Sequence, residues 1–378
     1  MSTRDLLGAA DVSDTQLADM VASLLHDEVE SVHDVAVEPV DYDLPAITTV
    51  GRWWVSGAAA TPAGEQRFRM FLKHVQAWER HPFFQLVPEE YRADAAAGIP
   101  WRTEPLVYRS DLADRLPDGL AMPRALGVFD IDELSAAVWL EEVPAPPATW
   151  DLARYGRAAH LLGRLAASRR VSPLGRLGTD FTLTWYASGR LAIQVVPMLR
   201  SDEIWRHPLC AAFDRELRDR LLTASDRALE LAAEIDALPF LTCHGDACPN
   251  NLLATERDDE VVVIDFGFWG RMPVGFDLGQ LLIGDVQIGK RSADTLAAVD
   301  EVIVSAYVDG LRAEGNDIGV DEVRRAHAIQ LLLMSGLSSV PFDLFEKPVT
   351  ADTMRIAADR AEIARYCLDL VDATALRS

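Results

Sequence analysis

Three polar residues near the middle of the chain stand in an order that suits phosphoryl transfer. Asp246 lies in a short loop-like run, Asn251 follows it by five residues, and Asp265 ends the apolar run Val261–Asp265. Transfer of a phosphoryl group from a nucleotide requires a carboxylate that orients the attacking hydroxyl, together with an amide and a carboxylate that hold Mg²⁺. These three residues supply those groups, and the polar segment between them predicts a short hairpin that returns Asp265 towards Asn251.

Two motifs carry these residues. The loop reads HGDxxxxN from His244 to Asn251, and the later strand ends in Asp-Phe-Gly, a motif shared with protein kinases, whose loop instead reads His-Arg-Asp. Together the motifs resemble the aminoglycoside phosphotransferase and choline kinase branch of the kinase-like fold. The resemblance implies that Asp246 is the catalytic carboxylate, that Asn251 and Asp265 bind the metal, and that His244 is a scaffold or substrate-side residue. It also implies ATP and Mg²⁺ as cofactors.

Length and charge limit the class of protein. A chain of 378 residues is long enough for two lobes with a large core. The 36 basic and 59 acidic residues give a net charge of −23, which argues against a nucleic acid or an anionic membrane as partner. The acidic surplus is compatible with a cationic small molecule such as an amino sugar, or with ordinary solvated helix faces.

Cysteine usage and hydropathy predict a cytoplasmic protein. Four cysteines are scattered without metal-binding spacing and are expected to be reduced thiols: Cys210, Cys243, Cys248 and Cys367. The first residues lack the apolar core of a signal peptide, and no run reaches the ~18 apolar residues of a membrane span. Use of ATP agrees with a cytoplasmic location.

The first part of the chain predicts a helical cap followed by a sheet. Ser13 and Gln16 form a capping box, and the apolar residues after them share one helical face, so a cap helix is expected within residues 1–34. Strands are expected near 35–40, 52–57, 67–73, 122–130 and 136–143. Pro and Gly in Thr61–Glu65 favour a hairpin turn between the second and third strands.

Lys73 and Glu104 are the expected anchors for the nucleotide phosphates. Lys73 lies late in the third strand, where the kinase fold places the lysine that contacts the α- and β-phosphates. Pro105 suits the first turn of a helix, so Glu104 should stand near a helix start and pair with Lys73, with Glu90 a poorer competitor. The alternatives are a solvated lysine and a glutamate that only stabilises the helix N-terminus.

The loop that covers the phosphates departs from the kinase pattern, because no GxGxxG motif is present. The run Leu44–Gly51 takes its place, and Thr48 and Thr49 are expected to bond phosphate through hydroxyl and backbone groups. By position, the backbone of Glu141 and Val143 would bond the adenine edge at an interlobe hinge.

The Pro-rich segment after residue 143 marks the expected boundary between lobes. The nucleotide-binding N-lobe then spans 35–143 and the C-lobe 144–378, with the catalytic loop, the metal site and the acceptor pocket. Within the C-lobe we expect a hairpin at 181–197, one long helix over about 211–237, and helices beyond 278. Asp277 should be structural, either capping a helix or bracing the catalytic loop.

The predicted fold is therefore α+β and two-lobed, with a kinase-like antiparallel sheet and a mostly helical C-lobe. The predicted function is phosphorylation of a hydroxyl on a sugar or amino sugar such as glucosamine, since the cap and the run Trp101–Ser110 resemble maltokinase-like members. The alternative acceptor is an aminoglycoside antibiotic. Asp285 and Glu346 could each hold an ammonium group, and Trp269 could stack on a sugar ring.

Two other classes of protein fit the sequence less well. A protein kinase would need an activation segment, which the chain lacks after Gly267. A non-catalytic pseudokinase that only binds nucleotide would be expected to have lost Lys73, Asp246 or Asp265, and all three are present. The sequence therefore favours an active small-molecule kinase, without indicating its oligomeric state.

Overall fold

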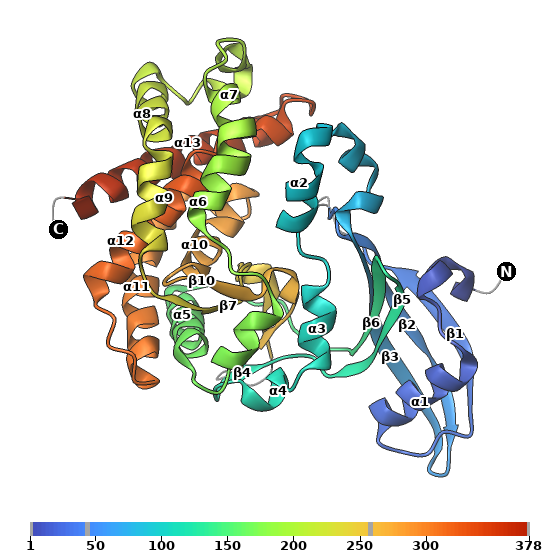
Figure 1. Ribbon diagram of the computed structural model, residues 1–378. Coiled ribbons are helices and arrows are strands. Elements are labelled where there is room, and N and C mark those ends of the chain that lie inside the picture. The colour runs from blue at the N-terminus through green and yellow to red at the C-terminus, as the bar shows by residue number, and fades with distance from the viewer. Residues whose placement is uncertain (1–2, 42–45, 256–259, 376–378) are drawn as a thin grey trace. The chain divides into compact units, whose positions relative to one another are not determined.

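The computed structural model describes residues 3–41, 46–255 and 260–375, and it divides into two compact units (Figure 1). Unit 1 comprises Met1–Arg115, Leu120–Pro146 and Ala254–Phe268; unit 2 comprises Leu116–Gly119, Pro147–Leu253 and Trp269–Ser378. The segment that carries Asp265 thus folds with unit 1, although it follows Asp246 in the chain. The lysine and the second carboxylate of the predicted site therefore belong to the same unit.

Unit 1 is built on a five-stranded antiparallel sheet with the order β1-β2-β3-β6-β5. Its strands are β1 (Ser31–Pro39), β2 (Thr49–Thr61), β3 (Gly64–Gln76), β5 (Ala125–Asp132) and β6 (Ser135–Glu141). All five strands were expected from the sequence. The predicted turn is also present, because Thr61 pairs with Gly64 and this glycine has a φ of 112° that residues with a side chain rarely adopt.

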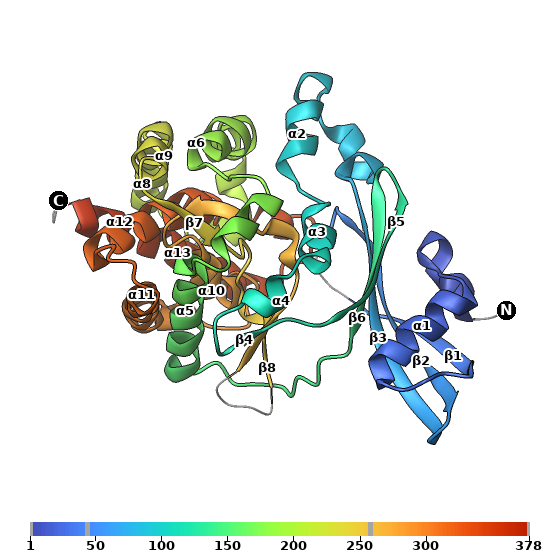
Figure 2. The same cartoon turned by 60° about the horizontal axis from the view of Figure 1, so that its bottom comes forward.

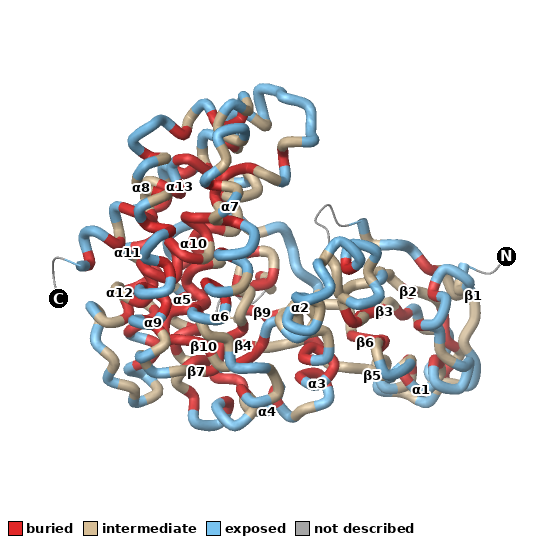
Figure 3. Tube along the Cα trace, turned by 45° about the horizontal axis from the view of Figure 1, so that its top comes forward, coloured by how far each residue is buried: buried red, intermediate tan, exposed pale blue. Residues whose placement is uncertain are grey.

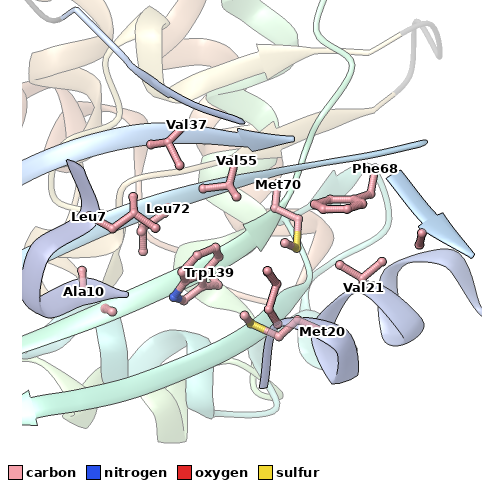
Figure 4. Close-up of a cluster of buried hydrophobic side chains, with 13 residues drawn as sticks. Leu7, Ala10, Met20, Val21, Val37, Val55, Phe68, Met70, Leu72 and Trp139 are labelled. Carbon is pink, nitrogen blue, oxygen red and sulfur yellow. The ribbon is translucent and has the colours of Figure 1, made fainter. Parts of the chain in front are cut away.

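The N-terminal cap packs on one face of this sheet (Figure 2). Helix α1 (Asp14–Leu25) begins with the predicted capping box, in which the Ser13 hydroxyl accepts from the Gln16 N–H at 3.2 Å. The 3₁₀ segment η1 (Thr3–Ala10) precedes it. Buried side chains of the cap, including Met20 and Val21, meet Trp139 and the inward residues of β3 in one cluster (Figure 4).

Strand alternation places Lys73 on the face away from the cap. Phe68, Met70 and Leu72 of β3 point into the cap cluster, so Lys73, one residue further, points to the opposite face. Helix α3 (Thr103–Arg109) packs against β5 and β6. The remaining short elements of unit 1 are η2 (Trp78–Arg80), η3 (Pro82–Leu86), η4 (Glu89–Tyr91), α2 (Arg92–Gly98), α4 (Leu112–Arg115), β4 (Leu120–Ala121), β9 (Val261–Val263) and η10 (Phe266–Phe268).

Unit 2 is mostly helical, and its buried residues gather in the central helices α5, α10, α11 and α12 (Figure 3). These helices span Leu152–Ala167, Asp277–Gln287, Leu296–Ala313 and Val320–Leu331. The other elements are η5 (Ser172–Leu177), η7 (Ile204–Arg206), η8 (Pro208–Cys210), β7 (Phe240–Cys243), η9 (Pro249–Asn251), β10 (Gly270–Pro273), η11 (Ala293–Thr295), η12 (Leu332–Gly336), η13 (Phe342–Leu344) and α13 (Ala351–Ala375). Strand β8 (Leu252–Ala254) lies where the chain passes from unit 2 to unit 1.

The hairpin predicted at 181–197 is wrong, because this segment is helical. It consists of α6 (Leu183–Tyr186), the π-helical turn η6 (Ala187–Val195) and α7 (Val196–Leu199). The Asp236 carboxylate accepts from the N–H groups of Leu183 and Thr184, both at 2.8 Å, and so caps the first turn from a distant helix. Such a tertiary cap is invisible in the local β-branched pattern, and tertiary context outweighs weak local propensity.

The single long helix expected at about 211–237 is two helices. Helix α8 (Arg215–Asp226) and helix α9 (Ala228–Asp236) meet at Arg227, which has φ −99° and ψ 3°. The apolar periodicity continues across the break, and for this reason the sequence predicts one helix. Asp214 caps α8 by accepting from the Leu217 N–H at 2.8 Å. The helix therefore begins at Arg215, about four residues later than expected.

Packing of the cap on the sheet can be tested by a pair of truncations. Met20 is 3% exposed in the cap cluster, so Met20→Ala should lower the free energy of unfolding by about 2–5 kcal/mol, from lost burial and the cavity left behind. Leu6 is 53% exposed in the same N-terminal segment, and Leu6→Ala should change the free energy of unfolding by less than about 0.5 kcal/mol. Urea unfolding of the full chain provides both values, and equal values would contradict the packing of α1.

Candidate active site

In unit 1, the predicted site residues are centred on the buried ammonium group of Lys73. Its Nζ atom lies 2.6 Å from a carboxylate oxygen of Glu104 and 2.8 Å from Oδ1 of Asp265. Lys73 is 5% exposed and Glu104 3% exposed. The ion pair predicted between Lys73 and Glu104 is therefore present, and Asp265 joins it as a second carboxylate.

Electrostatics keep this lysine charged. Burial by itself lowers the pKa of Lys73, but the carboxylates of Asp265 and Glu104 outweigh burial, so the pKa is raised above its ordinary value. An ammonium has three N–H donors, and two of them are directed to these carboxylates. The third is the group that could bond a phosphate oxygen.

Two aromatic residues that were not predicted from the sequence hold the carboxylates in place. The Tyr108 ring meets the Phe266 ring edge-on with centroids 5.6 Å apart, which joins helix α3 to the Asp-Phe-Gly segment. Asp265 has a φ of 62°, a left-handed conformation uncommon outside glycine. Burial raises the pKa of Tyr108 well above its usual value, so the phenol stays neutral beside Glu104 and Asp265.

Thr48 and Thr49, the residues expected to cover the phosphates, each use a backbone group to bond neighbouring segments of the chain. The Thr49 N–H donates to the Ala46 carbonyl at 3.1 Å, and the Thr48 carbonyl accepts from the Gln76 N–H at 2.9 Å. These two backbone groups close the end of the sheet, so only other groups of Thr48 and Thr49, such as their hydroxyls, could bond phosphate. Leu44 and Pro45 of the predicted loop lie outside the described residues.

The predicted hinge residue Glu141 ends β6 and is held by Arg124. Its N–H donates to the Arg124 carbonyl at 3.0 Å, and its carboxylate accepts from the Arg124 N–H at 2.9 Å. From Glu141, therefore, only the carbonyl could bond an adenine edge, whereas Val143 lies beyond the strand. The Arg124 guanidinium also donates to the Ser23 carbonyl at 2.9 Å, which connects the cap helix to the hinge, a link that the sequence analysis missed.

In unit 2, the predicted catalytic loop follows β7, and a buried carboxylate braces this loop. Asp277, at the start of α10, accepts from the His244 N–H at 2.9 Å and from the Gly245 N–H at 2.8 Å. The structural role predicted for Asp277 is confirmed in its bracing form. Burial raises the pKa of Asp277, whereas the nearby His244 side chain and the two N–H groups oppose that rise.

Within the loop, Asn251 and His244 position Asp246. The Asn251 side-chain N–H₂ group donates to the Asp246 carbonyl at 2.9 Å and to its carboxylate at 3.1 Å. With its nitrogen engaged, the atom that Asn251 could offer to a metal is its amide oxygen. His244 is fully buried, and its Nδ1 accepts from the Asp246 N–H at 3.3 Å, so the structure favours the scaffold role over the substrate-side role.

The acceptor residues suggested by the sequence fare differently. Trp269 is 1% exposed and donates from Nε1 to the Leu174 carbonyl at 2.9 Å, so the prediction that its ring stacks on a sugar is wrong. Its apolar ring fills the core beside β10, a placement that the motif spacing does not reveal. Glu346 is exposed in the turn after η13.

Asp285 is half-buried on α10, and the charges around it are mixed. Burial raises the pKa of Asp285, and the neighbouring Lys290 and Arg291 lower it. Lys290 also donates to the side-chain oxygen of Asn250, inside the catalytic loop, at 3.0 Å. Lys290 was not predicted from the sequence, since a lysine after a helix end carries no distinctive pattern.

Comparison with known proteins defines the class of protein. A sequence profile described as the phosphotransferase enzyme family matches residues 107–313, more than half of the 378 residues. The chain belongs to this family, and the prediction of a phosphotransferase is confirmed. Curated proteins include no significant match to this sequence.

Two solved structures show the same fold. A spectinomycin phosphotransferase, APH(9)-Ia, determined with ADP and spectinomycin, has a TM-score of 0.50 at 9% identity, over 96% of this chain and 99% of that chain. An aminoglycoside phosphotransferase from Alicyclobacillus acidocaldarius subsp. acidocaldarius has a TM-score of 0.54 at 14% identity, over 94% and 96%. The predicted two-lobed kinase-like fold is thereby confirmed. Among the described residues, no helix has the length and apolar character needed to cross a bilayer.

The contribution of the buried pair to stability can be separated from its contribution to activity. Lys73→Met leaves Glu104 buried without its partner and should lower the free energy of unfolding by about 3–5 kcal/mol. The double variant Lys73→Met/Glu104→Leu replaces the pair by apolar side chains and should recover most of that stability, while nucleotide binding stays lost. Urea unfolding and nucleotide titration measure the two properties. A double variant less stable than Lys73→Met would contradict this account.

Proposed function

We propose that the protein transfers the γ-phosphate of ATP to a hydroxyl group of a small molecule. The observation that carries the proposal is the buried Lys73 ammonium, bonded to both Glu104 and the Asp265 of Asp-Phe-Gly. The Asp277-braced loop with Asp246 adds the second half of the residue set that phosphoryl transfer needs. The spectinomycin phosphotransferase of the same fold was determined with ADP, which supports a nucleotide as donor.

Each proposed role follows from the chemistry of the side chain. The acceptor oxygen forms a bond to the γ-phosphorus, the bond from that phosphorus to the β–γ bridging oxygen breaks, and ADP leaves with the electron pair. Asp246 orients the acceptor hydroxyl and takes its proton. Lys73 bonds the phosphates through its third N–H, and Glu104 holds Lys73 in place.

The residues present also fit a magnesium ion. Mg²⁺ prefers oxygen ligands and is commonly held by one or two protein groups together with substrate phosphates. Asn251 offers its amide oxygen, since its nitrogen is bonded to Asp246, and Asp265 offers a carboxylate. When bound, Mg²⁺ would neutralise charge on the nucleotide phosphates.

Each part of the chain has a proposed role in this reaction. We place nucleotide binding in residues 35–143 with Asp265, a supporting cap in 1–34, and the catalytic loop and acceptor pocket in 144–378. The carbonyl of Glu141 and the N–H of Val143 would bond the adenine, and the hydroxyls of Thr48 and Thr49 the phosphates. The reaction would take place in the cytoplasm, where ATP is available.

For the acceptor, a sugar or amino sugar such as glucosamine is the first candidate, and an aminoglycoside is the second. The net charge of −23 favours a cationic acceptor, and Asp285 and Glu346 are the carboxylates proposed for its ammonium groups. Lys290 and Arg291 beside Asp285 weaken its attraction for a cation, so Glu346 is the less hindered of the two. The structure with spectinomycin supports the second candidate.

The proposal is tested by ADP release from Mg·ATP with a panel of acceptors: glucosamine, glucose, maltose, choline, homoserine and several aminoglycosides. One acceptor should give a clear signal, and Asp246→Asn should lower kcat by roughly 10²–10⁴-fold, because the loss of the base removes proton transfer in the transition state. The nucleotide dissociation constant should stay within about twofold, because Asp246 acts on the acceptor. Near-normal turnover by Asp246→Asn would remove it from the mechanism.

The same panel separates the candidate functions. Glucosamine favoured over glucose would support the amino-sugar acceptor, and a preference for aminoglycosides would support the second candidate. ATP binding without ADP release for any acceptor would support a non-catalytic nucleotide-binding module.

A further inference from the structure

The brace on the catalytic loop depends on the turn that precedes it. Asp277 holds the His244 and Gly245 N–H groups, but it stands at the very start of α10, immediately after the turn at Gly275. Gly275 has a φ of 83°, which favours glycine, and its carbonyl accepts from the Leu278 N–H at 3.1 Å. Any shift of this turn would therefore move the Asp277 carboxylate.

One side chain from another helix fixes that turn. The Tyr307 hydroxyl, from the middle of α11, accepts from the Gly275 N–H at 3.3 Å. Tyr307 is fully buried, and burial raises the pKa of its phenol well above the usual value, so it stays neutral. A buried backbone N–H without an acceptor is costly, and Tyr307 supplies that acceptor for Gly275.

Helix α11 is itself held in register by an unusually close contact with α5. A Cβ atom on Gly163 would lie 2.2 Å from the backbone oxygen of Tyr307, and one on Gly310 would lie 2.1 Å from the backbone oxygen of His160. The two helix backbones thus touch through reciprocal glycines, one of them directly at Tyr307. This contact fixes where the Tyr307 ring starts and hence where its hydroxyl ends.

We propose that Tyr307 is a positioning residue for phosphoryl transfer, which acts through Gly275 and Asp277 on the loop that carries Asp246. The contact of α5 with α11 positions the Tyr307 hydroxyl, which fixes the Gly275 turn. This turn sets the position of the Asp277 carboxylate, which binds the N–H groups of the loop. Its catalytic consequence rests on the proposed function, whereas its structural consequence does not.

The test compares Tyr307→Phe with Tyr366→Phe in the full chain. Tyr307→Phe keeps the ring and removes only the acceptor for the Gly275 N–H. Tyr366→Phe is the matched control, since it removes the hydrogen bond of 2.7 Å from the Tyr366 hydroxyl to the carboxylate of Asp300, which lies on the same helix α11 as Tyr307. Both variants should be less stable than the wild type, but only Tyr307→Phe should affect the loop.

Two readouts decide the outcome. In hydrogen exchange measured by mass spectrometry, peptides covering 243–251 and 270–280 should exchange about fivefold faster in Tyr307→Phe than in the wild type, the factor expected for loss of one hydrogen bond. In Tyr366→Phe the exchange rate of the same peptides should be unchanged. With the acceptor found above, kcat of Tyr307→Phe should fall by roughly tenfold while KM for ATP stays the same.

The outcomes distinguish the proposal from the function on which it rests. Unchanged exchange in the loop of Tyr307→Phe, or equal changes in both variants, would overturn the positioning role whatever the activity. Faster exchange with unchanged kcat would overturn its catalytic part. If the wild type turned over no acceptor, the proposed function would fail, and the exchange data would still decide whether Tyr307 fixes the loop.

Discussion

Unit 1 depends on the requirement that a buried ammonium group be paired. Burial of Lys73 without partners would cost several kcal/mol, and two carboxylates remove most of that cost. One comes from α3, so this short helix must lie against the sheet. The other, Asp265, comes from a segment far along the chain that belongs to the same unit.

Unit 2 solves a related problem with backbone groups in place of a side-chain cation. The loop after β7 turns its N–H groups at residues 244 and 245 into the core, where they need an acceptor. Asp277 supplies both acceptor atoms, and the turn before it is fixed in its own right by Tyr307. The loop that is proposed to carry the catalytic base thus gains rigidity from the two helices α10 and α11. Such supporting residues hold a reactive group in the geometry that catalysis needs.

Much of this arrangement could be predicted from the sequence, because the informative signals are local. Alternating apolar residues placed the strands of the sheet, and the order Asp246, Asn251, Asp265 indicated the chemistry. The pairing of Lys73 with Glu104 followed from the place of a late-strand lysine in the kinase fold, together with a proline in a first helical turn. The bracing role of Asp277 followed from the family resemblance.

The errors and omissions share a physical cause, which is that tertiary contacts decided the outcome. The segment 181–197 has a β-branched pattern, yet Asp236 caps it as a helix. Trp269 stands beside the metal motif but packs into the core. Tyr108, Arg124 and Tyr307 act through partners distant in sequence, so no spacing rule reveals them.

The central claim is that Asp265 can bind a metal that tightens nucleotide binding while Glu104 keeps Lys73 in place. Titration calorimetry with a non-hydrolysable ATP analogue, with and without Mg²⁺, tests it most directly in the wild type and in Asp265→Asn. The account predicts that Mg²⁺ tightens binding to the wild type by roughly tenfold or more and has little effect on Asp265→Asn, whose amide is a much weaker ligand. Equal tightening in both proteins, or none in the wild type, would contradict it.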